Sequence, residues 1–257
     1  MNFEDYKNYF GRVQICKYED DFLFSTVGVP HTVGVFEVNI SDSGMHTFSI
    51  SQKGERMFAK DSGYQYSQGR LTLAKAEGST FSEGIKFIGG KTSISARDTF
   101  LEVTDMEAGL YYLCVEMDWV DDATEDFYNV TCYGASKAHF TNVMHDVDRE
   151  SFLRAVCESI VNEDGEGIEV EQDEECSEVY KYTVDIDSGY QMYCIKNQHD
   201  ANTYTESVEY TKFEGLQLLP PEGGNTFDIE VKAGETKVVV MRQSCKGFSM
   251  SKSYSSQ

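Results

Sequence analysis

Short runs in which apolar and polar residues alternate recur along most of the chain, with turn sequences between them. In one run Phe36, Val38 and Ile40 would share one face of a strand, while the intervening residues face the other side. The turn sequence Ser-Asp-Ser-Gly at 41–44 follows at once. Many short strands at regular spacing are typical of sandwiches and barrels. The pattern therefore predicts an all-β fold.

The pattern divides into two halves around residue 140. Strands are expected in the first half at 31–40, 45–52, 70–76, 84–88, 99–103, 109–119 and 127–133. Strands are expected in the second half at 179–186, 190–196, 206–210, 226–231 and 237–242. At 148–161 the apolar residues instead recur at helical spacing, and Asp148 is a candidate N-cap. We therefore expect two tandem antiparallel β-sandwich domains, 1–137 and 138–257, linked by this short helix and ending in a loose polar tail at 249–257.

The formal net charge is -22 at pH 7. Nucleic acids and anionic lipids are bound largely through Lys and Arg, so this charge disfavours both as partners. Proteins with basic surfaces, or divalent cations, are favoured instead. The alternative is that the charge only maintains solubility. No stretch approaches the roughly 20 apolar residues of a membrane helix, so no transmembrane segment is expected.

Two acidic segments are candidates for calcium binding, because hard cations take several oxygen ligands from flexible loops. Between 158 and 178 there are ten acidic residues and no Lys or Arg, which predicts a solvated loop. Within it, Asn162-x-Asp164-x-Glu166-Gly167 imitates the opening of an EF-hand loop, although the twelfth position is Asp173 in place of Glu. Asp164 and Glu166 are therefore candidate ligands for weakly bound calcium.

The second acidic segment lies at 116–126 and supplies two further candidate calcium ligands, Asp121 and Asp122. For both segments the alternative is a solvated loop that binds no metal. No other cofactor is expected.

Motifs of catalysis are missing from the sequence. There is no phosphate-binding loop, dinucleotide fingerprint, GxSxG or HExxH motif. The seven cysteines are an odd number in a chain without a signal-peptide pattern, which predicts reduced, buried thiols in the cytoplasm. Cys114 and Cys194 lie in apolar runs, and the acidic residues before Cys176 oppose thiolate formation. We expect the protein not to be an enzyme.

One segment of each half has the same pattern of residue types. Residues 105–115 and 185–195 both read as an acidic turn with glycine, followed by an aromatic-rich strand with Cys at the fifth place after the glycine. The pattern predicts two sandwiches built around the same hairpin. The alternative is chance convergence on hairpin chemistry. We expect Tyr111, Tyr112, Tyr190 and Tyr193 to pack in the core.

Several motifs resemble a known family. The motif Val-Glu-Met-Asp-Trp at 115–119, together with 46–52 and 130–134, resembles strands of the β-sandwich that follows the protease core in calpain-like proteins, above all those of ciliated protists. The stretch 10–17 resembles the segment that joins core and sandwich. The stretches 213–221 and 231–237 resemble the terminal domain of these proteins. The Gln-Gly-rich, Cys-Trp setting of the calpain nucleophile has no counterpart, because the single Trp119 does not follow a cysteine.

The resemblance implies a non-catalytic calpain tail, of tandem domain III-like sandwiches, with the protease core absent. Its expected function is that of a structural or adaptor protein that binds partner proteins in a large multi-subunit assembly. In a ciliated protist this assembly could be the axoneme of the cilium, within the cytoplasm. The alternative that the resemblance implies is a calcium-responsive regulatory module that acts with a calpain protease.

Overall fold

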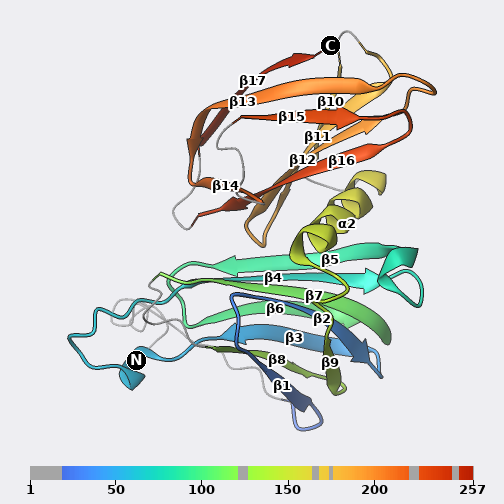
Figure 1. Ribbon diagram of the computed structural model, residues 1–257. Helices are drawn as coiled ribbons and strands as arrows, with labels where there is room; N and C mark the ends of the chain where they lie inside the picture. The colour runs from blue at the N-terminus through green and yellow to red at the C-terminus, as the bar shows by residue number, and fades with distance from the viewer. Residues whose placement is uncertain are drawn as a thin grey trace, which may run out of the picture.

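The alternating runs of the sequence form antiparallel strands in a computed structural model of the chain (Figure 1). The structure describes residues 19–120, 127–163, 168–173, 176–219, 226–244 and 249–256. The expected all-β class, with two antiparallel sandwiches and a linking helix, is confirmed.

The first sandwich consists of two sheets. Its strands are β1 (Leu23–Val29), β2 (Val33–Ile40), β3 (Gly44–Ser51), β4 (Gln68–Ala76), β5 (Ile85–Ser93), β6 (Asp98–Met106), β7 (Gly109–Asp118), β8 (Tyr128–Gly134) and β9 (Ala138–Asn142). Short 3-10 helices occupy Glu55–Met57 and Phe81–Glu83. One sheet has the order β1-β8-β3-β6 and the other β5-β4-β7-β2-β9. Phe48, Leu113 and Val130 are among the side chains buried between them.

The second sandwich is built in the same way. Its strands are β10 (Ile168–Gln172), β11 (Val179–Ile186), β12 (Tyr190–Asn197), β13 (Tyr204–Glu214), β14 (Leu216–Leu219), β15 (Thr226–Val231), β16 (Thr236–Gln243) and β17 (Ser249–Ser256). A sheet of order β10-β11-β12-β16-β14 faces a smaller one of order β15-β13-β17. Tyr193, Ile195, Val208 and Val231 contribute to the core between them.

The helix α2 (Arg149–Asn162) begins where the sequence predicts it. The carboxylate of Asp148 accepts a hydrogen bond of 2.7 Å from the backbone N–H of Ser151, which satisfies one of the free N–H groups of the first turn. The helix buries the residues that share its apolar side: Phe152, Leu153, Val156, Cys157, Ile160 and Val161.

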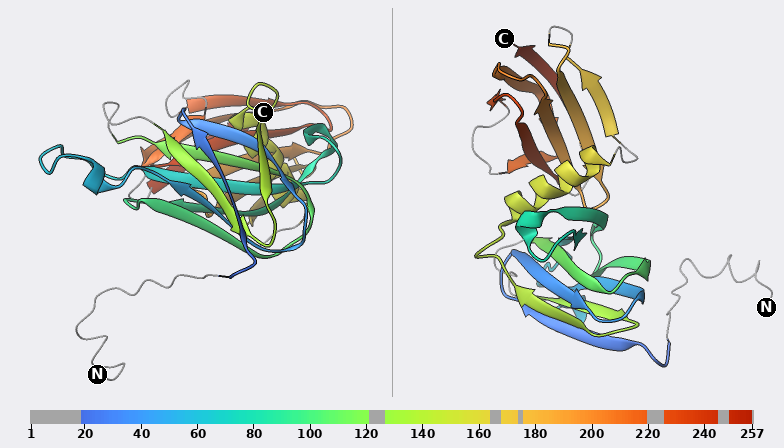
Figure 2. Two further views of the ribbon diagram at one scale, coloured as in Figure 1. Left: turned by 90° about the horizontal axis from the view of Figure 1, so that it is seen from below. Right: turned by 90° about the vertical axis from the view of Figure 1, so that its right-hand side faces the viewer.

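Helix α2 lies between the two sandwiches (Figures 1 and 2). It contacts β2 and β5 of the first sandwich and β11, β12 and β16 of the second. Strand side chains alternate between faces, so Leu113 of β7 points into its own sandwich while Tyr112 and Cys114 face the helix. On β12, Met192 and Cys194 likewise face the helix. Full burial of a side chain such as Met192 contributes about 1.5–3 kcal/mol. The two sandwiches therefore share a third apolar core.

The boundary expected at residue 137 falls immediately before β9. β9 pairs with β2, for example Ala138 with Ile40, so the first sandwich extends to Asn142. The expected pair of matching hairpins also holds only in part. β11 and β12 pair as a hairpin, whereas β6 and β7 belong to different sheets and the turn between them crosses from one sheet to the other. Cys114 and Cys194 nevertheless occupy equivalent places, because both face α2.

Two segments expected to be irregular contain strands. The acidic stretch from 158 to 178 starts within α2 and includes β10, which pairs with β11. The expected loose tail contains β17, which pairs with β13. Burial of Tyr111, Tyr112, Tyr190 and Tyr193 to 3% exposure or less confirms that these aromatic side chains belong to the cores.

Candidate functional site

A buried carboxylate, Glu116, lies at the joint between the sandwiches. It is on the same face of β7 as Cys114, because residues two apart in a strand share a face, and so it points toward α2 and the second sandwich. Its side chain is 0% exposed. An isolated carboxylate at such a place would be costly, so its partners decide whether it stabilises the fold.

Glu116 is surrounded by three arginines from three elements. Arg149, at the start of α2, donates from Nη1 to Oε2 at 3.0 Å. Arg242 of β16 donates from Nη1 to Oε1. The Nη1 atom of Arg70, on β4 and 1% exposed, lies 3.9 Å from Oε1. We call Glu116, Arg70, Arg149, Arg242 and Tyr190 the joint cluster.

Tyr190 of β12 completes the joint cluster from the second sandwich. Its hydroxyl donates to Oε2 of Glu116 at 2.6 Å, and its ring lies 5.9 Å from the guanidinium carbon of Arg70. Asp118 of β7 adds a second carboxylate, 3.6 Å from Arg70 and 3.7 Å from Arg242. The cluster thus joins β4 and β7 to α2, β12 and β16.

The pKa values of the joint cluster keep it ionised. Burial by itself would raise the pKa of Glu116, but Arg149, Arg70 and Arg242 outweigh it and hold that pKa below its usual value. Burial raises the pKa of Tyr190 well above its usual value, with the charge of Glu116 acting in the same direction. Glu116 is therefore a fixed anion and Tyr190 a fixed donor, which suits a structural ion cluster and not proton transfer.

A second buried polar cluster lies inside the second sandwich. Nζ of Lys181 is 2.8 Å from Asp173 and 3.5 Å from Glu206. The hydroxyl of Tyr193 donates to Glu206 at 3.0 Å, and that of Tyr204 donates to Asp173 at 2.9 Å. One cation is therefore shared by two carboxylates within this cluster.

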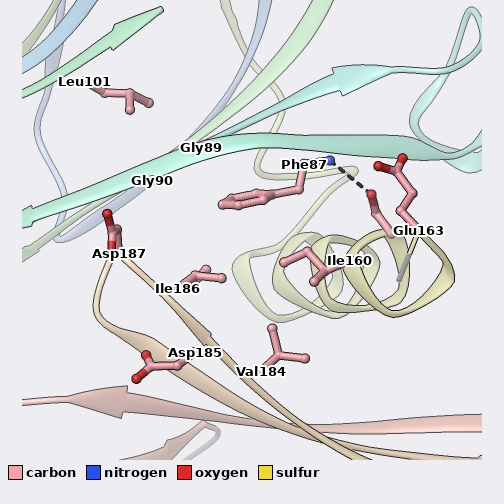
Figure 3. A pocket seen from close by; sticks show the side chains of 11 residues that line it. Phe87, Gly89, Gly90, Leu101, Ile160, Glu163, Val184, Asp185, Ile186 and Asp187 are labelled. Carbon is pink, nitrogen blue, oxygen red and sulfur yellow. Dashed lines mark hydrogen bonds between the residues drawn. The ribbon is translucent and has the colours of Figure 1, made fainter. Parts of the chain in front are cut away.

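A groove opens beside the joint cluster, between β5, α2 and the turn that joins β11 to β12 (Figure 3). Its volume is about 500 Å³. The backbone N–H of Phe87 donates to the hydroxyl of Ser159 at 3.0 Å, which ties β5 to the helix at the edge of the groove. Asp185 and Asp187 stand at the turn, and Glu163 stands at the end of the helix.

The candidate calcium ligands Asp121, Asp122, Asp164 and Glu166 lie outside the described residues. The two ends of the EF-hand-like stretch are described, and both are engaged by lysines: Asn162 accepts from Lys196 at 3.3 Å, and Asp173 pairs with Lys181. Within the described part of the chain, no group of three or more His, Cys, Asp or Glu side chains is placed to hold a metal ion.

The described cysteines are all free thiols, and most are buried. Burial raises the pKa of Cys114 and that of Cys132, the latter to about 12. The pKa of Cys157 is also raised, by a hydrogen bond with Cys194 and by burial. Cys176 is exposed. A raised pKa removes the thiolate that nucleophilic catalysis needs, so none of these three thiols is an activated nucleophile.

The joint cluster was not predicted, although part of its signal is visible in the sequence. Glu116 interrupts an otherwise apolar strand that is buried on both faces, where a charge needs a buried partner. Its partners Arg70, Arg149 and Arg242 are 46, 33 and 126 residues away along the chain. Nothing in the local sequence of Arg242 indicates that it reaches Glu116.

The chain matches no protein-family model and no curated protein. Comparison with solved structures gives matches at low TM-scores. An uncharacterized protein from Burkholderia cenocepacia has a TM-score of 0.28 and 10% identity, over 95% of this chain and 78% of that one. Vicilin from Corylus avellana, the hazelnut, has a TM-score of 0.19 and 9% identity, over 92% and 77%. Oxalate decarboxylase from Lactobacillus farciminis has a TM-score of 0.20 and 9% identity, over 90% and 76%. Scores this low carry no argument about function.

Among the described helices, none has the length and apolar character required to cross a bilayer.

Proposed function

We propose that this protein is a non-enzymatic structural or adaptor protein that binds proteins with basic surfaces in a multi-subunit assembly. One observation carries the proposal: the buried cations of the fold are matched internally. Arg70, Arg149, Arg242 and Lys181 are paired with the carboxylates of Glu116, Asp118, Asp173 and Glu206. These charges cancel, so the formal net charge of -22 rests on the remainder of the chain.

An acidic surface on a rigid body favours one class of partner. A negative surface potential speeds encounter with basic proteins and repels nucleic acid and anionic lipid. The shared core and the joint cluster fix the two sandwiches to each other, which supplies the rigidity that an adaptor needs. Both buried polar clusters are used to stabilise the fold, and the raised thiol pKa values disfavour cysteine catalysis.

The kind of assembly is inferred from the sequence resemblance alone. A calpain-like tail of this kind, in a ciliated protist, would belong to a large cytoplasmic assembly such as the axoneme. Regulation by calcium remains the alternative that this resemblance implies, through Asp121, Asp122, Asp164 and Glu166.

The proposal is tested by purifying the tagged full-length chain from cells that express it naturally, at about 50 mM and about 500 mM salt. Exposed charge pairs weaken as the screening length falls from roughly 14 to 4 Å over this range. We expect stoichiometric partners with basic surfaces at low salt, and their loss at high salt. Absence of a stoichiometric partner at low salt, or retention that does not depend on salt, would contradict the proposal.

A further inference from the structure

The groove between β5, α2 and the β11–β12 turn has an apolar floor. Phe87 and Leu101 come from the first sandwich, Ile160 from the helix, and Val184 and Ile186 from the second sandwich. In Figure 3 the ring of Phe87 and the side chains of Ile160 and Ile186 project into the same space. Side chains from three separate parts of the fold thus line one hollow of about 500 Å³.

Carboxylates surround this floor, and their partners differ. Glu163 forms an exposed ion pair with Lys86 at 3.0 Å. Asp185 accepts a hydrogen bond of 3.0 Å from Gln243, which leaves its negative charge uncompensated. Asp187 is exposed and has no hydrogen bond or ion pair to any described residue. The turn end of the groove therefore carries two negative charges without a cation.

Two consecutive glycines of β5 face opposite sides of their sheet. A Cβ atom on Gly90 would lie 2.8 Å from Cβ of Ser188, so this glycine allows the β11–β12 turn to approach β5 closely. A Cβ atom on Gly89 would meet only Cδ1 of Leu101, at 3.4 Å, which is ordinary contact. Close packing does not demand a glycine at 89. Gly89 pairs with Leu73 and faces the interior of the first sandwich, on the other side of β5 from Phe87.

We infer that this groove binds a short segment of a partner protein in which a Lys or Arg is next to an apolar residue. The apolar side chain lies over Phe87, Ile160 and Ile186, and the cation lies at the turn end beside Asp187. Asp185, whose side chain is on the opposite face of β11 from Ile186, adds a second negative charge nearby. Lysine and arginine suit the site because their long aliphatic stems cover apolar surface while the charged end reaches an anion. The inference rests on the proposed function and specifies the site and the sequence chemistry of the partner.

Charge complementarity selects this occupant over the alternatives. A second copy of the chain also has a formal net charge of -22 and would be repelled by the same carboxylates. An apolar segment without a cation would leave Asp185 and Asp187 partly desolvated and unpaired, which is costly. A small polycation such as spermidine would satisfy the charges but leave the floor exposed to water.

The test is NMR titration of the isotope-labelled full-length chain with the probe peptide Ac-Gly-Lys-Leu-Lys-Gly-NH2. Two further probes are the same peptide with Ser in place of Leu, and spermidine. We expect the leucine peptide to shift the amide signals of Phe87, Ile160 and Ile186 and to bind at least about threefold more tightly than the serine peptide, as burial of one apolar side chain allows.

Variants separate the groove from the overall charge. Asp185→Asn with Asp187→Asn should weaken binding of the leucine peptide roughly three- to tenfold, as expected for two exposed ion pairs. Phe87→Ala should also weaken it, by removing the aromatic ring from the floor without a change of charge. The matched control is Glu209→Gln with Glu230→Gln, which removes the same charge from exposed positions on β13 and β15. The control should change binding less than about twofold.

Each other outcome overturns the inference. Equal weakening by the control pair, or equal binding of the serine peptide or of spermidine, would show attraction to the acidic surface in general; the proposed function would then stand while the groove site fails. Absence of binding to all three probes would overturn the groove site as well. Only when salt-sensitive partners are also missing from the native cells would the proposed function fail with it. A melting temperature measured for every variant ensures that each one is folded. If Phe87→Ala does not fold, the Asp185 and Asp187 double variant decides the test.

Discussion

The hydroxyl of Tyr190 on β12 donates a 2.6 Å hydrogen bond to the carboxylate of Glu116 on β7, and this bond crosses from one sandwich to the other. Both residues are buried, and Arg70 contacts both of them. The joint is therefore held by directional polar contacts as well as by the apolar layer around α2. This arrangement leads to predictions about stability and its dependence on pH.

Replacement of Glu116 by glutamine should destabilise the whole protein. The change leaves Arg70, Arg149 and Arg242 in a buried site without their shared carboxylate, and breaking such a buried ion pair costs about 3–5 kcal/mol. Urea denaturation should show a lower midpoint. Glu209→Gln, at an exposed position on β13, is the control and should stay within about 0.5 kcal/mol of the wild type. A midpoint for Glu116→Gln equal to that of the control would refute a structural role for the joint cluster.

The contribution of Glu116 should disappear in acid. The pKa of Glu116 in the folded state lies below its unfolded value of about 4.3. Its stabilising effect is therefore fully present above pH ~4.3 and is lost as the pH falls through the lower, folded pKa. The difference in unfolding free energy between wild type and Glu116→Gln, measured from pH 7 down to acid, should be constant at first and then shrink. A difference in unfolding free energy that grows in acid would contradict a lowered pKa of Glu116 in the folded state.

Two neighbouring glycines should differ sharply in their tolerance of alanine. Gly90→Ala places a Cβ atom 2.8 Å from Cβ of Ser188 and 3.1 Å from its backbone nitrogen, so the two sandwiches must shift apart, at a cost of about 1–3 kcal/mol. Gly89→Ala meets only Leu101 at 3.4 Å and should be neutral or slightly stabilising. Thermal unfolding of the two variants makes the comparison. Similar melting temperatures would mean that the approach of the turn to β5 is not close.

Among the described cysteines, only Cys176 should react rapidly with iodoacetamide in the native protein. Cys114, Cys132, Cys157 and Cys194 are buried, and the first three have raised pKa values. These four should become labelled only after denaturant is added, as mass spectrometry of the digested protein will show. Rapid labelling of any of the four under native conditions would restore the case for a reactive thiol.

Calcium and magnesium should raise the melting temperature equally. Both ions screen an acidic surface in the same way, whereas a true calcium site prefers one ion and adds stability according to its affinity. A rise specific to calcium, lost in chelator and in Asp164→Asn with Glu166→Gln, would support the regulatory alternative. The same comparison with Asp121→Asn and Asp122→Asn tests the other acidic segment.

The strands were predictable where the alternation was strong. β2 ends at Ile40, as the pattern Phe36-Val38-Ile40 predicts, and the helix begins after its predicted cap, Asp148. β10 and β17 were missed because glutamate and serine side chains dominate them and hide the strand signal. Both strands have little strand propensity of their own. β10 is stabilised by pairing with β11, and β17 by pairing with β13.

The third core and the joint cluster could not be read from the sequence. A strand that is apolar on both faces, such as β7, indicates two buried faces but does not say what covers the second one. The cover is α2 and the second sandwich, and the position of Arg242 beside Glu116 depends on that docking. The groove depends on it too, since Phe87 and Asp187 are 100 residues apart in the chain.

The helix between the sandwiches also has a mechanical consequence. Because α2 is wedged between two sheets and contacts strands of both, the joint has no free hinge about which the halves could swing. Two partner proteins, one bound to each sandwich, would then be held at a fixed distance and in a fixed relative orientation.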